Sequence, residues 1–412
     1  MAKSHQKTRI VLFVYGGGMR GMVAGHILAR IEEATGLAMA DMVDIFTGPS
    51  TGSIITAALT TPATDYPVWH PSARPRFKAK HMVKFYEREG AKIFPPDRFR
   101  AFRGFIHDFN NRTVKISQLN NIFKHGHYNP AHLTQALKKL YGETNLNQTL
   151  RSLVIPVYNI DKAGRQQMRR KDVDFTDFMS ESGQALWLKH MAGSTDPRAN
   201  VDVKLYDAVL GSAAAPTFFP CHHFKLRMPG MSEPMECSGV DGSVFDSPSI
   251  TWHGAVRQHI QPDEKVIMIL IGTGYTGRSY KRDEWNRFGG LGVVDPRNDL
   301  PLINILFQAP ESALMDGFAQ DMGDNLFVFN KSLRVGGKDG VPAPAVQIDD
   351  ASPENLAYME GFANSIIEDN QARFDALCHI LTQNRDQHVA HKISLWKSLR
   401  KKVFYPRSSH LQ

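Results

Sequence analysis

The chain repeats one local pattern twice near its N-terminus: a short apolar strand, a glycine turn and a helix. Thr8–Tyr15 is apolar and β-branched, glycines cluster at 16–21, and Val23–Thr35 then carries apolar residues at helical spacing. The second unit runs from Val43–Thr47 through Gly48-Pro49-Ser50-Thr51-Gly52 into a helix of small residues. Uniformly apolar strands are typical of parallel sheets with helices on both faces. The two units therefore predict an α/β fold.

The alternation continues, so we expect a three-layer α/β/α fold with a mainly parallel central sheet. No repeat or low-complexity linker divides residues 1–385, which we interpret as one domain followed by a basic amphipathic tail at 386–412. The further predicted elements are strands at Leu153–Ile160 and Val266–Ile271, and helices at Lys78–Gly90, Pro130–Tyr141, Leu302–Phe318 and Asn355–Leu381.

Composition narrows the class of protein. A hydrophobic fraction of 42% and a charged fraction of 22% are typical of a globular chain. Three cysteines do not suggest a disulfide framework and fit a reducing compartment. No apolar run approaches the ~18 residues of a membrane-spanning helix, and Ile10–Tyr15 is too short for a secretory signal. We expect a cytoplasmic protein.

Gly48-Pro49-Ser50-Thr51-Gly52 has the G-x-S-x-G form of a nucleophile elbow. The turn between strand and helix is so tight that the residues two before and two after the serine must be small. It exposes the Ser50 hydroxyl at a helix N-terminus, where partial positive charge favours a developing oxyanion. The sequence thus makes Ser50 the candidate nucleophile and the Thr51 N–H a candidate oxyanion donor.

The glycine turn at 16–21 has three interpretations. Gly16, Gly18 and Gly21 satisfy the dinucleotide fingerprint G-x-G-x-x-G, with Asp41 and Asp44 near the distance expected of its acidic residue. The turn could also be purely structural. We favour an oxyanion loop, because a dinucleotide-binding unit has no use for the second glycine turn around Ser50.

Several motifs together resemble those of the patatin-like phospholipase family, in the family's order over roughly residues 8 to 385. The sequence departs from the family pattern at Ser53 and Ser243, where glycine is usual, and only loosely matches it over Val244–Pro248. The matching motifs are Gly16-Gly17-Gly18-Met19-Arg20-Gly21, Gly48–Ser53, Gly211-Ser212-Ala213-Ala214-Ala215-Pro216 with Phe219-Pro220, Val240-Asp241-Gly242, and Gly272-Thr273-Gly274.

The resemblance implies a Ser-Asp dyad with no metal and no cofactor. Asp241 would accept the proton of Ser50, which would attack an acyl ester of a phospholipid or lysophospholipid and form an acyl-enzyme. The resemblance also implies an oxyanion hole, which would be formed by Gly16, Gly17, Gly18, Met19, Arg20, Gly21 and Thr51.

Other functions stay open at this point. His253 and His259 follow Asp241 in the Ser…Asp…His order of an α/β-hydrolase triad, which we rank below the dyad. The same site could serve an acyltransferase, or the chain could be a silent lipid- or nucleotide-binding protein. Spacing does not support a zinc site in the cluster formed by Cys221, His222, His223 and Cys237.

The C-terminal tail holds most of the net charge of +8. Residues 391–412 contain six Lys or Arg and no Asp or Glu, and Ile393, Trp396, Leu399 and Val403 recur at helical spacing. This pattern is typical of an interfacial helix, although a helix packed on the body or a solvated end would also fit. We expect peripheral membrane association and no nucleic acid partner.

Some expectations about partners are open-ended. An activating protein or small-molecule ligand is compatible with the sequence, as is delivery to another cell as a bacterial effector. Phe94–Phe105 interleaves arginine and phenylalanine, which suits a cap over an acyl site, a membrane-touching loop or a partly buried connector whose arginines reach solvent.

Overall fold

The protein is described here by a computed structural model. It describes residues 7–68, 70–95, 128–161, 183–194, 196–275, 279–293, 298, 301–333 and 342–385. The stretch around Phe99 and the whole tail at 386–412 lie outside the described residues, so the domain division at 385 and the membrane tail stay predictions. Among the described helices none is both long and apolar enough to cross a membrane.

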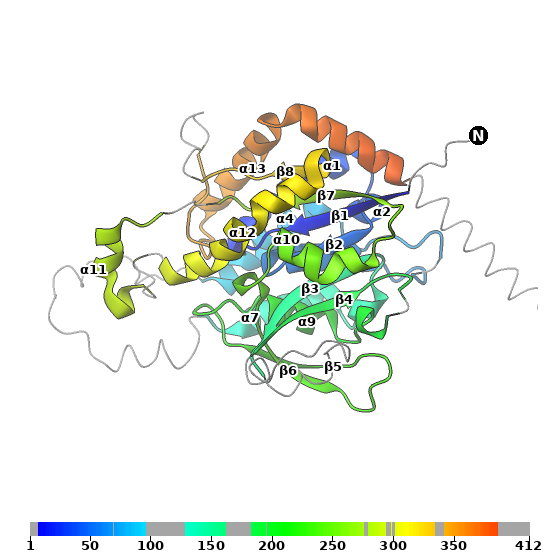
Figure 1. The fold of residues 1–412 in the computed structure, drawn as a ribbon, viewed down its shortest axis with the longest axis horizontal. Coiled ribbons are helices and arrows are strands. Elements are labelled where there is room, and N and C mark those ends of the chain that lie inside the picture. The colour runs from blue at the N-terminus through cyan, green and yellow to red at the C-terminus, as the bar shows by residue number, and fades with distance from the viewer. Residues whose placement is uncertain are drawn as a thin grey trace, which may run out of the picture.

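The described strands form one sheet with the order β5-β6-β3-β2-β1-β7-β8, and β4 pairs with β3 off this path (Figure 1). Strands β3, β2, β1, β7 and β8 are parallel, while β4, β5 and β6 add antiparallel pairs. The expected mainly parallel sheet is confirmed. The strands are β1 (Thr8–Val14), β2 (Ile45–Thr47), β3 (Ser152–Asn159), β4 (Gln184–His190), β5 (His222–Leu226), β6 (Met235–Asp241), β7 (Lys265–Ile271) and β8 (Leu326–Phe329).

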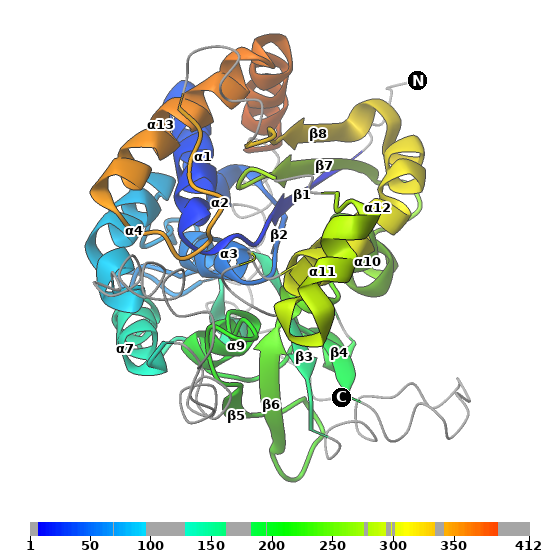
Figure 2. The ribbon, with the colours of Figure 1, turned by 90° about the vertical axis from the view of Figure 1, so that its left-hand side faces the viewer.

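Helices cover both faces of the sheet, as Figure 2 shows with α1, α4 and α13 on one side and α10 and α12 on the other. The three-layer expectation is confirmed. The helices are α1 (Gly21–Thr35), α2 (Met39–Met42), α3 (Thr51–Thr60), α4 (Ala79–Ile93), α7 (Pro130–Tyr141), α9 (Leu205–Ser212), α10 (Pro248–Thr251), α11 (Arg282–Gly292), α12 (Pro301–Met322) and α13 (Pro353–Glu368).

The alternation of side chains along β1 creates two cores. Ile10, Leu12 and Val14 join the larger core beneath α1, α3, α4, α9 and α13. Val11 and Phe13 point to the opposite face and join the smaller core, which α12 and the segment after α10 complete. Because both faces of β1 are buried, its residues are apolar without a break, which is why the first strand could be recognised in the sequence.

Strand β3 has one partner on one edge and two on the other. β4 pairs with it along residues 153–159. On the remaining edge β2 pairs through residues 152–154 and the antiparallel β6 through residues 157–159. The C-terminal ends of β2 and β6 therefore point toward each other, separated by Ile155 and Pro156. Pro156 has no N–H to donate to a neighbouring strand. It lies between the part of β3 that pairs with β2 and the part that pairs with β6.

Two sequence expectations need correction. The single helix expected at Asn355–Leu381 is broken: α13 ends at Glu368 and a further helix covers 371–385. The cause is local, since the Asn370 side chain donates 2.9 Å to the carbonyl of Ile366 and competes with the helical backbone bonds. The motif at 211–216, for which the family resemblance implies a helix of small residues, is helical only as far as Ser212, where α9 ends.

Candidate active site

The turn at 48–52 packs directly against the end of β1. A Cβ added at Gly48 or at Gly52 would lie 2.0 Å from the Val14 carbonyl oxygen. Gly48 also has φ 150°, which disfavours any other residue. The two glycines of the predicted elbow are therefore needed because the main chain of a neighbouring strand lies against both of them.

Ser50 lies at the junction between β2 and α3 in a strained conformation. Its φ of 55° and ψ of −128° are rare for a residue with a side chain. Its N–H is held by Ser212, at 3.1 Å from the carbonyl oxygen and 3.2 Å from Oγ. Ser53, one of the departures from the family pattern, donates 2.6 Å to the Ser50 carbonyl. These contacts keep Ser50 at the N-terminus of a buried helix.

Asp241 ends β6 and is brought to Ser50 by the shared edge of β3. Its N–H donates 3.0 Å to the Ala214 carbonyl, two residues after the group that holds Ser50. Only 1% of Asp241 is exposed, and burial raises its pKa to about 6 against the opposing effect of a hydrogen bond from the Ser50 hydroxyl. At neutral pH the carboxylate is thus mostly ionised and can accept a proton.

The residues after Asp241 complete its surroundings. The N–H of Ser243 donates 2.8 Å to Asp241 Oδ1, and this backbone hydrogen bond favours the charged carboxylate. Gly242 is packed so closely on β3 that an added Cβ would lie 2.3 Å from the carbonyl oxygen of Pro156. The Asp-Gly pair therefore reflects close packing rather than a simple surface turn.

The glycine loop lies beside Ser50. A Cβ at Gly16 would lie 3.2 Å from Ser50 Cβ and 2.6 Å from Ser243 Oγ. The Thr273 hydroxyl anchors the loop by donating 2.7 Å to the Gly16 carbonyl. Gly18 has φ 57° and contacts the carbonyl of Ile348.

The backbone N–H groups of this loop have different uses. Met19 donates to Ile348 at 2.8 Å and Arg20 to Gly17 at 3.2 Å, while the N–H of Gly21 bonds within the loop. No described residue accepts a hydrogen bond from the N–H of Gly17, Gly18 or Thr51. The N–H of Gly16 likewise has no acceptor among the described residues, so these four expected oxyanion-hole residues offer the donors that the fold has not already used.

Arg20 is a buried cation within the loop. It is 8% exposed, and burial lowers its pKa to about 10, so it stays charged. Its Nε and Nη1 atoms find no acceptor among the described residues. A buried guanidinium in this state favours negative charge nearby.

The other sequence candidates lie apart from Ser50. His253 is exposed, and His259 lies in a cavity with Arg9, at the end of the sheet where β1 begins. His222 bonds Asp207 at 2.8 Å and Cys237 is buried in the core, so those side chains serve the packing of β5 and β6. Within the described residues no group of metal-ligating side chains is present.

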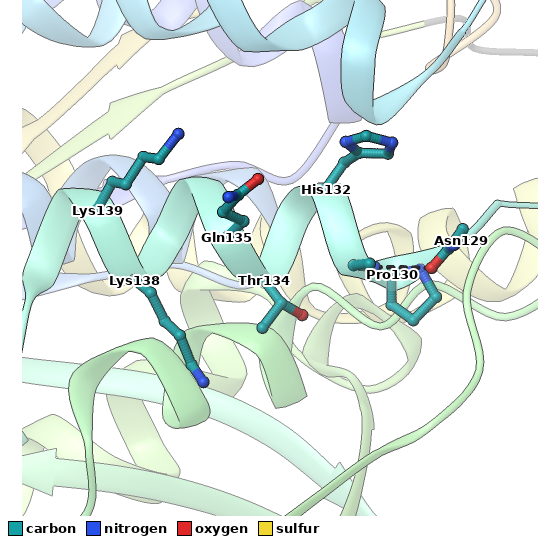
Figure 3. Close-up of a pocket in the computed structure, with 8 residues that line it drawn as sticks. Asn129, Pro130, His132, Thr134, Gln135, Lys138 and Lys139 are labelled. Atoms are coloured by element: carbon teal, nitrogen blue, oxygen red, sulfur yellow. Dashed lines mark hydrogen bonds between the residues drawn. The ribbon is translucent and has the colours of Figure 1, made fainter.

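One hollow of the structure lies away from Ser50. A volume of about 800 Å³ is lined by Asn129 and residues of α7. Figure 3 shows that Lys138 and Lys139 point to different sides of this helix, so its charges do not converge on one centre. The motif at 211–216 was recognised in the sequence, but neither this hollow nor the backbone hydrogen bonds accepted by Ser212 and Ala214 could be predicted from it.

The packing at 48–52 gives a first prediction. Gly52→Ala should lower the melting temperature and abolish labelling of Ser50 by a fluorophosphonate probe, because its Cβ cannot fit against Val14. Gly317→Ala is the matched control: it is helical with open space around it, so it should keep full labelling and stability. Wild-type labelling of Gly52→Ala would contradict this account of the turn.

Comparison with known proteins supports one family. A family model described as Patatin-like phospholipase matches residues 12–251. Patatin-like protein 1 of Arabidopsis thaliana is 30% identical over 73% of this chain and 67% of its own. Patatin-like protein 4 of the same plant is 27% identical over 96% and 94%, and Patatin-16 of Solanum tuberosum 24% over 87% and 83%. The chain therefore belongs to the patatin-like phospholipase family and is a lipid acyl hydrolase.

Proposed function

We propose that the protein cleaves acyl esters of phospholipids or lysophospholipids through a Ser50–Asp241 dyad. The observation that carries this proposal is the position of the two residues: a strained serine at a helix N-terminus lies beside a buried carboxylate, and its hydroxyl lowers the pKa of that carboxyl. A serine is a weak nucleophile until a base takes its proton. Asp241 is the base that lies beside it.

The proposed reaction has two steps. The Ser50 oxygen attacks the ester carbonyl while Asp241 takes its proton, and the alcohol or lysolipid leaves with that proton as the acyl-enzyme forms. Water then attacks the acyl-enzyme with Asp241 again as base, which releases the fatty acid and restores Ser50.

The oxyanion of each tetrahedral intermediate would be held by the N–H groups of Gly17, Gly18 and Thr51. These donors are fixed before the reaction and lie on the loop and helix that flank Ser50. The buried charge of Arg20 adds a favourable potential at the same loop. This arrangement requires neither a metal nor a cofactor in the proposed reaction.

An acyltransferase would use the same acyl-enzyme, with an alcohol in place of water. No observation on the described residues favours an alcohol acceptor, so hydrolysis is the first proposal. Product analysis separates the two: purified protein with mixed phospholipids should release free fatty acid, whereas a transferase would build a new ester on an added lysolipid or alcohol.

The dyad predicts a characteristic pattern of losses. Ser50→Ala and Asp241→Asn should each lower kcat on a soluble short-chain ester at least about 10³-fold, and the double variant should be little worse than either, because the two act as a unit. Circular dichroism spectra should match wild type. Residual activity within about tenfold, or ~1.4 kcal/mol of barrier, would exclude the residue concerned. An equal loss in His253→Ala would favour a triad.

The burial of Asp241 predicts a dependence on pH. The ionised carboxylate is the active form, so kcat/KM should fall as the pH drops through about 6. Ser243→Gly removes a buried hydroxyl next to the carboxylate and keeps the backbone N–H, so the surroundings of Asp241 become less polar and this acidic limb should move to higher pH. Ser249→Gly, a buried serine outside the dyad, is the control. An unchanged limb in Ser243→Gly would refute this role.

The tail should govern membrane association rather than chemistry. Deleting residues 391–412 should weaken binding to anionic vesicles and leave turnover of a soluble ester unchanged, because each basic residue near such a surface contributes ~1 kcal/mol. Binding of the full chain should weaken with salt. The Trp396→Ala variant distinguishes apolar insertion from charge. Loss of thermal stability and soluble-ester turnover together would instead indicate a helix docked on the body.

A further inference from the structure

A second polar cavity lies at the end of the sheet opposite Ser50. It has a volume of about 340 Å³ and is lined where β1, β2 and β3 begin, by Arg9, Ile45 and Ser152. The loop after β4 and the turn at 257–261 complete it. Ser50, in contrast, follows the C-terminal end of β2. The cavity is therefore separate from the candidate active site.

Lys189 supplies a buried positive charge beside this cavity. It belongs to β4, and only 8% of it is exposed. In the part of the chain that the structure describes, its ammonium makes no ion pair and no hydrogen bond, and burial lowers its pKa to about 8. Its charge acts on Asp196 and His259, which both line the cavity. A buried ammonium without a partner is costly and favours an anion nearby.

The carboxylate of Asp196, which lines the cavity, already accepts hydrogen bonds from the protein. Asp196 accepts hydrogen bonds from the Arg198 backbone N–H at 3.0 Å, from Nε at 3.1 Å and from Nη2 at 3.2 Å. Arg9 is likewise paired, with Glu264 at 2.9 Å and Asp44 at 3.6 Å. Lys189 and Arg198 together thus exceed Asp196 by one positive charge.

Neutral donors surround the same space. The Nε2 atom of His259 is buried without a partner, and burial, ahead of the charge of Lys189, lowers the pKa of this imidazole to about 4. Ser152 Oγ accepts from Ala192 N at 3.0 Å and Ser194 Oγ from Asp196 N at 3.2 Å. Because each serine oxygen already accepts a bond, its own proton can be donated into the cavity.

We propose that this cavity binds a phosphate-class oxyanion, with Lys189 supplying the charge and His259, Ser152 and Ser194 the hydrogen bonds. Several donors converging from different segments match an anion with more than two oxygen atoms. The proposal is independent of the reaction at Ser50. The phosphate group is recognised whether it comes as free phosphate or within a phosphomonoester.

The test is calorimetric titration of the full chain with inorganic phosphate, against sodium chloride at equal ionic strength. Lys189→Met, which keeps the length of the side chain, should weaken binding at least tenfold. Asp196→Asn should tighten it, because the competing negative charge is lost while the amide oxygen still accepts from Arg198. Lys225→Met is the matched control, since Lys225 is exposed and pairs with Glu236 at 2.9 Å. It should bind phosphate as the wild type does.

Two further arms make the outcome decisive. Ser50→Ala should bind phosphate normally, which separates this site from the dyad. Glycerol 3-phosphate binding more tightly than inorganic phosphate would assign the site to phosphomonoesters, and equal binding would assign it to the phosphate group alone. Unchanged affinity in Lys189→Met, or the same heat with chloride, would overturn the proposal. If Lys189→Met does not fold, unchanged affinity in Asp196→Asn overturns it instead.

Discussion

The structure depends on one edge of β3, which two strands share from opposite directions. β2 brings the chain to Ser50 and β6 brings it to Asp241, and both end on the same edge because β4 occupies the other. The short interval between them leaves room for the elbow on one side and the Asp-Gly turn on the other. A serine and a carboxylate far apart in sequence thereby contact each other without any loop having to carry them.

A second set of contacts fixes Ser50 and Asp241 relative to each other. The backbone at the end of α9 accepts the Ser50 N–H at Ser212 and the Asp241 N–H at Ala214, so one stretch of main chain orients both. Small residues are needed there because Gly211 packs against Phe224 and Val157. The motif at 211–216 therefore positions Ser50 and Asp241 rather than binding a ligand. Because α9 ends at Ser212, the carbonyl groups of Ser212 and Ala214 are free to accept the two N–H groups.

Much of this was readable from the sequence, and the reasons differ by element. β1 and β2 are almost wholly buried and α1 buries one face, so their apolar residues and the adjoining glycine turns could be recognised in the sequence. Ser50 and Asp241 were predicted from motifs whose glycines are required by close backbone contacts with Val14 and Pro156. The antiparallel strands β4, β5 and β6 were missed for two reasons. The alternation of apolar and polar residues is weak in strands at the margin of a sheet, and strand pairing joins segments that are distant in the sequence. Two other features could not be predicted: the break between helices at Asn370, and the hydrogen bonds that the backbone N–H groups of Met19 and Arg20 already make. Each depends on single hydrogen bonds, which no residue pattern encodes.

The shared edge of β3 also bears on the order of events during synthesis. Ser50 is complete in the chain long before β3 and β6 emerge, and contacts between distant segments form slowly. Until β6 pairs with β3, the serine has no carboxylate to take its proton and the end of α9 is not in place to hold its backbone. In the proposed mechanism a nascent or partly folded chain would therefore carry Ser50 without its base, and a competent site would exist only after the sheet has closed.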